Sequence, residues 1–383
     1  MVEGRDEAGP ASRRRPPWGL LGMVGLVMAI EWTLAGHDLD FTTPMHWDWR
    51  VIGKAATRPD RVAGKDVLLF GDSLVKFGIM PRVIRERSGK VAYNFALHTG
   101  QTSSSYFMLR RALRAGARPS AVVLDLTPHM LSHAPAINQS LWAELLSPAE
   151  CLDMARTMND PGFFTSTLLA TAIPSYKERH EIRAEILAKV KGQTVSRRGQ
   201  IPMFRRNWKV NEGAQLMSDS PAPTLNVEEW TSSLYARWAP DPVNVAYLGR
   251  FLDLARSREI PVYWLLPPIH PAIQARTEAT GYDAHYTRFV QDVAARFPGI
   301  TVVDARRSGL AADLFMDGAH VNRRGALKLS AALAEVLADR PSAGPTARWV
   351  ALDLGRAGSV DLPMEDVMQS AEIVRAAEAT TRR

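Results

Sequence analysis

The stretch Val67–Leu74, with the sequence VLLFGDSL, decides the fold of this chain. Four apolar residues in a row, one of them β-branched and one aromatic, predict a short buried strand. Gly71 and Asp72 end the run, and helix-like spacing resumes at Val75. Ser73 is therefore expected on a strand-to-helix turn, beside the N–H groups of the helix start. That position suits a nucleophile whose attack generates an oxyanion, although an N-cap serine without chemistry is the simpler interpretation.

A second stretch, Asp317–Asn322 (DGAHVN), favours the interpretation of Ser73 as a nucleophile over that of a simple N-cap. Asp317 stands three residues before His320. At that spacing the carboxylate can hold one imidazole nitrogen and leave the other free to take a proton from Ser73. We therefore expect Ser73 to be the nucleophile, His320 to be the general base and later the acid, and Asp317 to orient the imidazole.

The two stretches resemble the motifs of a known superfamily. Gly71–Leu74 is the GDSL signature, and Asp317-x-x-His320 is similar to the closing block of the GDSL/SGNH hydrolases. This resemblance implies an α/β fold, a three-layer α/β/α sandwich with a parallel, flavodoxin-like sheet. The two blocks lie further apart than a minimal member of the superfamily needs, which implies an insertion between them.

The resemblance also implies an oxyanion hole. The amide of Ser73 is one expected donor, and Gly100 resembles the second-block glycine, where the backbone must approach the substrate closely. The third block departs from the pattern, because His129 stands where an asparagine is expected. A neutral imidazole can donate one hydrogen bond, so His129 either replaces the amide or points away. The loss of one such donor costs ~10²–10³ in rate.

Two further histidines are candidate substrate-binding residues. His98 is close to Gly100, and His270 follows the fourth predicted strand. A surface position for His98 and a loop-capping role for His270 are the structural alternatives. A metal site built from the histidines at 129, 270 and 320 is not expected, because their spacing does not match a metal centre. We expect no metal and no cofactor.

The rest of the chain alternates between strands and helices. Strands are predicted at 66–71, Val91–Ala96, Ala121–Leu126, Ile260–Leu266 and Gly299–Asp304. Helices are predicted at Tyr106–Ala115, Val243–Arg258, Tyr286–Phe297 and Asn322–Asp339. This alternation predicts a parallel sheet with helices on both faces and right-handed crossovers.

The chain divides into four segments: an N-terminal tail and anchor (1–36), a connector (37–64), an SGNH-like domain (65–340) and a peripheral C-terminal extension (341–383). The connector is polar, aromatic and irregular in pattern. The extension ends in a helix-like segment, Pro363–Ala377. The domain contains an insertion at about 137–240, which forms either a lid or substrate wall or a bundle packed elsewhere. Helices are predicted within it at Ser147–Met158, Phe163–Ala172 and Tyr176–Val190, followed by a long loop at Ser196–Pro223.

The amino terminus indicates the compartment. Arg13–Arg15 precede an apolar run, Trp18–Ala35, whose only charged residue is Glu31. The run is close to the ~20 residues that a membrane-spanning helix needs. Positive charge before it predicts a cytoplasmic amino terminus, with the catalytic domain on the outer (periplasmic or extracellular) side of the cell membrane. A cleaved signal peptide and a buried core helix are the alternatives.

Composition narrows the function classes. The chain is 46% hydrophobic and 23% charged, which is ordinary for a globular protein. Its net charge of +7 comes from scattered arginines without interleaved aromatics, so nucleic acid is not indicated as a partner. A single cysteine, Cys151, excludes an intramolecular disulfide.

We therefore expect an exported, membrane-anchored serine esterase or O-acyltransferase that acts on O-acyl esters through an acyl-Ser73 intermediate. The resemblance makes cell-envelope glycans the first substrate class to test. The alternative is a non-catalytic envelope scaffold or glycan-binding protein that retains the fold. The histidine at position 129 favours this alternative, whereas Ser73, Asp317 and His320 favour the enzyme.

Overall fold

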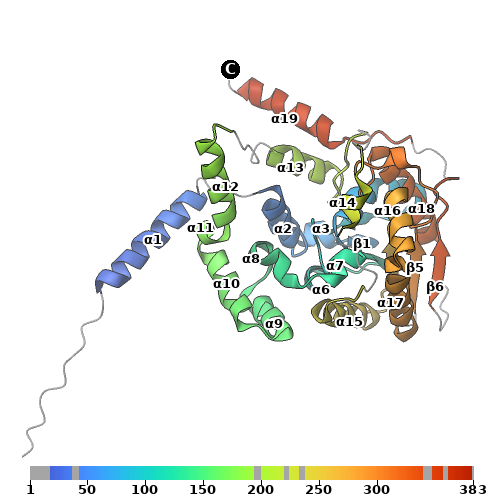
Figure 1. Cartoon of the computed structure of the whole chain (residues 1–383), viewed down its shortest axis with the longest axis horizontal. Helices are drawn as coiled ribbons and strands as arrows, with labels where there is room; N and C mark the ends of the chain where they lie inside the picture. Colours follow the sequence, from blue (N-terminus) through green and yellow to red (C-terminus); the bar gives the residue numbers. More distant parts are fainter. Residues whose placement is uncertain are drawn as a thin grey trace, which may run out of the picture.

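The computed structural model describes residues 18–36, 43–193, 200–219, 224–232, 238–297, 299–339, 347–356 and 361–381 (Figure 1). The predicted tail with Arg13–Arg15 lies outside these residues. So do several positions of the predicted loop Ser196–Pro223.

One six-stranded sheet, parallel throughout, forms the centre of the molecule, with the strand order β2-β1-β3-β4-β5-β6. Its strands are β1 (Val67–Phe70), β2 (Ala92–Asn94), β3 (Ala121–Asp125), β4 (Val262–Leu266), β5 (Ile300–Asp304) and β6 (Arg348–Ala351). The order of the first five strands is flavodoxin-like, so the predicted α/β class and three-layer arrangement are confirmed.

Two layers of helices cover the sheet. Leu68 and Phe70 of β1 pack into one apolar core, whereas Val67 and Leu69 pack into the other, as the alternation of side chains along a strand requires. The first core is closed by α2 (Pro44–Ala55), α6 (Thr102–Arg114), α15 (Pro242–Arg256) and α17 (Tyr282–Arg296). The second core is closed by α4 (Ser73–Gly78), α5 (Pro81–Ser88) and α18 (Arg323–Ala338).

The described residues of the connector, 43–64, are not irregular, so this part of the expectation was wrong. They contain α2 and the short α3 (Pro59–Val62). Thr43 caps α2 by accepting the N–H of His46, and Trp49 is fully buried against the core. The Trp49 indole donates to the carbonyl of His98 at 2.8 Å. Because α2 is amphipathic and packs on the loop after β2, it belongs to the body of the domain.

The insertion is largely helical. Its elements are η1 (Pro135–Asn138), α8 (Gln139–Leu145), α9 (Pro148–Met158), α10 (Pro161–Ala172), α11 (Pro174–Lys177), α12 (Arg179–Val190), α13 (Ile201–Val210) and α14 (Val227–Thr231). Two expectations need correction. The helix predicted at Tyr176–Val190 starts earlier and is split between α11 and α12, and the predicted loop Ser196–Pro223 contains α13.

The C-terminal extension is more closely integrated than predicted. Its strand β6 pairs with β5 at the edge of the sheet, where a strand needs no continuous apolar run and so escaped detection. The helix predicted at Pro363–Ala377 is α19 (Val367–Thr381), which packs beside α13 (Figure 1). Arg206 of α13 binds the carboxylate of Glu365 just before α19, at 2.6 Å.

The first helix, α1 (Trp18–Gly36), projects from the body of the molecule (Figure 1). Its large apolar side chains are exposed, and its one acid, Glu31, accepts hydrogen bonds from Ser175 of α11. Within the described ranges, no helix combines the length and the apolar character that a membrane crossing requires.

Candidate active site

The turn after β1 holds Ser73 at the first position of α4. Gly71 has a φ of +144°, and a Cβ there would lie 2.9 Å from both Cβ and the carbonyl oxygen of Asp125, so a glycine is required. Among the described residues, the N–H of Ser73 has no hydrogen-bond partner. The turn therefore presents both a hydroxyl and a free amide at the carboxyl edge of the sheet.

The structure brings Ser73, His320 and Asp317 together, although 247 residues separate the serine from the histidine. Ser73 Oγ lies 2.8 Å from His320 Nε2, and His320 Nδ1 lies 2.8 Å from Asp317 Oδ2. The other Asp317 oxygen accepts the N–H groups of Ala319 and His320 at 2.8 and 2.7 Å. Burial acts to raise the pKa of Asp317, but these hydrogen bonds and the imidazole lower it below its ordinary value.

Backbone contacts hold the loop that carries Asp317 and His320. Phe315 and Val321 form an antiparallel bridge, and the N–H of Met316 donates to the carbonyl of His320 at 2.9 Å. The buried Asn322 then caps α18 by accepting the N–H of Gly325. The relay is thus fixed at both of its ends, by the glycine turn and by this bridge.

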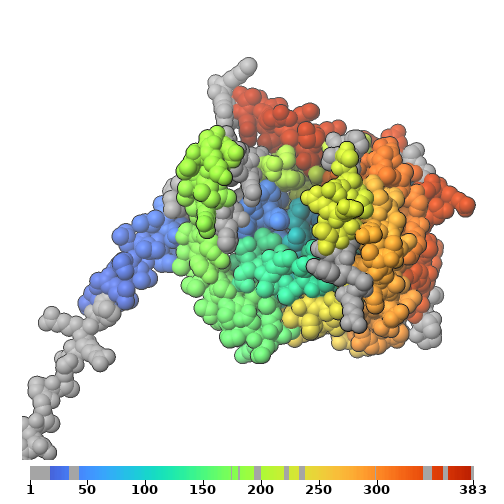
Figure 2. Space-filling model, viewed as in Figure 1, coloured from blue at the N-terminus to red at the C-terminus, as the bar shows by residue number. Residues whose placement is uncertain are grey.

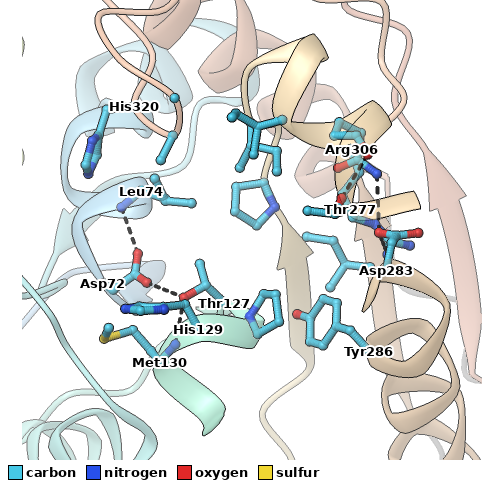
Figure 3. Close-up of a pocket in the computed structure, with 18 of the residues that line it drawn as sticks. Asp72, Leu74, Thr127, His129, Met130, Thr277, Asp283, Tyr286, Arg306 and His320 are labelled. Atoms are coloured by element: carbon cyan, nitrogen blue, oxygen red, sulfur yellow. Dashed lines mark hydrogen bonds and ion pairs between the residues drawn. The ribbon is translucent and has the colours of Figure 1, made fainter. Parts of the chain in front are cut away.

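A pair of carboxyl groups lies under the Ser73 turn. Asp72 accepts the N–H of Leu74 at 2.8 Å and the hydroxyl of Thr127 at 2.7 Å (Figure 3). Asp125, at the end of β3, is 1% exposed, and its carboxyl group interacts with Asp72. Burial, reinforced by the charge of Asp72, raises the pKa of Asp125 well above its ordinary value.

Sequence reasoning did not identify Asp125 as part of the site. The signal was present, since an acid ends the otherwise apolar strand run AVVLD. A buried acid whose pKa is strongly raised is more common at functional sites than elsewhere. Its position under the turn makes Asp125 a packing and positioning group for Asp72.

Gly100, which follows β2, lies against the Ser73 turn. A Cβ on Gly100 would lie 2.3 Å from the carbonyl oxygen of Gly71, so the two loops approach as closely as their backbones permit. The N–H of Gly100 donates to the carbonyl of Leu97 at 3.1 Å. Its use as an oxyanion donor would therefore require this turn bond to open or to be shared.

His129 belongs to the short helix α7 (Pro128–Ser132) and lines the pocket beside Ser73 (Figure 3). Its ring lies 4.2 Å from the ring of His133, centroid to centroid. Burial, with the neighbouring His133, lowers the pKa of His129. The imidazole is therefore neutral at neutral pH and has one N–H to donate into the pocket.

The other two candidate histidines do not line this pocket. His98 pairs with Asp48 of α2 at 2.9 Å and packs against Phe77, which separates it from His320. His270 caps α16 (Pro271–Ala279), its Nδ1 accepting the N–H of Ala272 at 3.3 Å. Burial lowers the pKa of His270. Both side chains have structural partners next to the site.

The pocket has a volume of about 350 Å³ and opens between the carboxyl ends of β1, β3 and β4. The insertion contributes one wall through Trp230 of α14, whose ring lies 2.6 Å from the place of a Cβ on Gly318. Figure 2 shows α14, in yellow, against the orange surface of α16. Of the insertion, α14 thus forms part of the pocket wall, and its role toward a substrate stays a prediction. Within the described part of the chain, no three His, Cys, Asp or Glu side chains are arranged to hold a metal ion.

The sequence matches one protein-family model. The family model described as a protein of unknown function, DUF1574, matches residues 54–329. The chain belongs to the DUF1574 family. The matched part includes Ser73, Asp317 and His320, together with the whole sheet apart from β6. No curated protein matches the chain.

Proposed function

We propose that this member of the DUF1574 family is an SGNH-type serine esterase or O-acyltransferase. The single observation that carries the proposal is the continuous relay from Ser73 Oγ through His320 to Asp317, with both links at 2.8 Å. A serine hydroxyl is a weak nucleophile unless a base removes its proton, and this geometry provides the base and the group that orients it.

The residues take the following roles in the first half-reaction. His320 Nε2 takes the proton of Ser73 while Oγ attacks the ester carbonyl carbon, and the carbonyl electron pair moves onto the oxygen. The free N–H of Ser73 stabilises that oxyanion, and the N–H of His129 is the proposed second donor. His320 then protonates the departing alkoxide, and an acyl-Ser73 ester remains. Asp317 stabilises the imidazolium throughout.

The second half-reaction reverses these roles. A water molecule or another hydroxyl attacks acyl-Ser73 and gives its proton to His320, and Ser73 regains that proton as it leaves. Water makes the protein an esterase, whereas a sugar hydroxyl makes it an O-acyltransferase. We propose a cell-envelope glycan as the alcohol component, on the basis of the resemblance to GDSL/SGNH hydrolases.

The proposed location is the outer side of the cell membrane, with residues 1–36 as the tether. Support comes from Arg13–Arg15 before the apolar run and from the exposed apolar side chains of α1. Membrane fractionation of the full chain and of a chain lacking residues 1–36 tests this location. Full-length protein found in the soluble cytosol would contradict it.

The acyl-enzyme itself tests the chemistry. Mixing the protein with excess p-nitrophenyl ester is expected to release p-nitrophenol in a burst of one equivalent per protein molecule. Mass spectrometry is expected to find the acyl group on the peptide that contains Ser73. The Ser73→Ala variant, equally folded by circular dichroism, is the control. Folded wild-type protein that never acquires an acyl group at Ser73 would favour the scaffold alternative instead.

A further inference from the structure

The pocket beside Ser73 has apolar walls. Pro128 and Met130 of α7 form one side, Leu266 ends β4 and Ile269 follows it, and Ile273 of α16 completes the lining. Contact between such a surface and an apolar chain removes apolar area from water and is favourable. The apolar walls offer no hydrogen-bond partners to a polar chain. The pocket therefore suits an apolar part of the substrate.

Two hydroxyl groups of the lining that lie away from the relay are already committed to protein partners (Figure 3). The Tyr286 hydroxyl donates to the carbonyl of Leu126 at 2.7 Å, and the Thr277 hydroxyl donates to the carbonyl of Gln274 at 2.8 Å. A sugar placed here would lose hydrogen bonds to water without gaining replacements from these groups, which is unfavourable. The glycan or other alcohol component must then lie outside the pocket, and the acyl component inside it.

A network of paired charges bounds the end of the pocket opposite the relay. Arg306 donates to Asp283 at 2.8 Å and to Asp304 at 2.7 Å. Figure 3 shows His320 and Asp72 on one side of the pocket, and Arg306 and Asp283 on the other. An apolar chain that starts at Ser73 therefore meets a polar, hydrogen-bonded boundary, which limits its length.

The volume sets the scale of that length. A cavity of about 350 Å³ holds roughly ten non-hydrogen atoms if each takes about the volume of a water molecule, ~30 Å³. The ester carbonyl and its oxygens occupy part of this space. An acetyl group would leave most of the cavity without partner atoms.

We infer that the acyl group carried by Ser73 is an apolar chain of roughly six to eight carbons, not acetyl. The inference rests on the proposed function, because it assigns the acyl class of the same site. Ile273, which is 4% exposed, is the specificity-determining side chain most open to test, because it comes from a helix outside the relay.

An ester series measures this preference. We expect kcat/KM for p-nitrophenyl esters to rise roughly fourfold for each added methylene, or roughly 250-fold from two to six carbons. It should then fall beyond about eight carbons, where the chain meets the Arg306 network. Activity that depends on Ser73 but is greatest on acetate, or is indifferent to chain length, would overturn the inference and leave the proposed function intact.

Substitutions at Ile273 should move the optimum in opposite directions. Ile273→Phe is expected to shorten the preferred chain by about two carbons, and Ile273→Ala to lengthen it, as volume is removed or added. Ile186→Phe, on the exposed face of α12, is the matched control and should leave the profile unchanged. Two opposed variants keep the test informative if one of them fails to fold. An optimum that stays fixed in both folded variants contradicts the assignment.

Binding separates this inference from failure of the proposed function. Calorimetry on Ser73→Ala protein is expected to show octanoate binding at least tenfold more tightly than acetate, with Ile273→Phe weakening octanoate alone. If octanoate binds more tightly than acetate but the wild-type protein cleaves no ester, the apolar pocket is supported and the esterase proposal is contradicted. Equal, weak binding of both acids would overturn the pocket assignment itself.

Discussion

Two Asp–His pairs lie on either side of the Phe77 ring. On one side His320 binds Asp317 at 2.8 Å, and on the other side His98 binds Asp48 at 2.9 Å. The two imidazole rings lie 5.3 and 5.0 Å from Phe77, centroid to centroid. Two pairs built from the same residue types thus lie close together in the molecule.

Their third partners differ. The free nitrogen of His320 reaches the hydroxyl of Ser73, whereas the second oxygen of Asp48 binds the ammonium group of Lys76 at 2.6 Å. Asp48 and Lys76 are fully buried, whereas the side chains of Asp317 and His320 are 32% and 21% exposed. We therefore propose that one Asp–His pair serves as a proton relay, whereas the other belongs to a neutralised structural cluster. The third group and the access to solvent make the difference.

The largest expected effect is the loss of activity when the partly exposed pair, Asp317 and His320, is broken. His320→Ala should lower kcat/KM by ~10⁴ or more, because Ser73 then lacks its base. The free energy of unfolding should change little, because the side chain is partly exposed. His98→Ala is the matched control and should keep kcat/KM within a few-fold of the wild type. Similar losses in the two variants would erase the distinction between the pairs.

The buried pair should instead govern stability. Asp48→Asn leaves the Lys76 ammonium buried without its counter-charge, which should cost ~3–5 kcal/mol in the free energy of unfolding. Urea denaturation measures the loss. The double variant Asp48→Asn/Lys76→Met should recover part of it, since no unpaired charge remains. A single variant as stable as the wild type would show that the cluster contributes nothing to folding.

The next largest expected effect is a loss of turnover when the side chain of His129, in the pocket beside Ser73, is removed. His129→Ala should lower kcat by ~10² if its N–H stabilises the oxyanion, with KM little changed. His133→Ala, which removes the neighbouring ring, is the control and should have a much smaller effect. An unchanged rate in folded His129→Ala protein would remove this residue from the oxyanion hole.

The smallest effect is a difference in acid stability. Burial acts to raise the pKa of Asp48, but Lys76 and His98 outweigh it and lower the pKa below its ordinary value of 3.8. The contribution of this group is therefore fully present above about pH 4 and is lost as the pH falls through the lowered pKa of the folded state. Urea unfolding between pH 7 and 3 should show a shallower decline in Asp48→Asn than in the wild type. Parallel curves would contradict this assignment.

Sequence reasoning anticipated the relay because each half is local. A continuous apolar run identified β1 and the turn that carries Ser73, and the three-residue spacing of Asp317 and His320 was visible directly. Strands β3, β4 and β5 were predictable for the same reason, since a strand covered on both faces is apolar throughout.

The buried cluster was not predictable in this way. Asp48 lies on α2, Lys76 on α4 and His98 in the loop after β2, and no local pattern connects them. Trp230 and β6 were missed for related reasons. One is a single side chain brought over Gly318 by tertiary packing, and the other is a half-exposed edge strand.

Covalent labelling with a serine-reactive fluorophosphonate tests the central claim most directly. We expect one label per folded molecule, located on Ser73, with labelling abolished in Ser73→Ala and strongly slowed in His320→Ala but retained in His98→Ala. Folded wild-type protein that resists the reagent, or that carries the label elsewhere, would contradict the claim that Ser73, His320 and Asp317 form a catalytic relay.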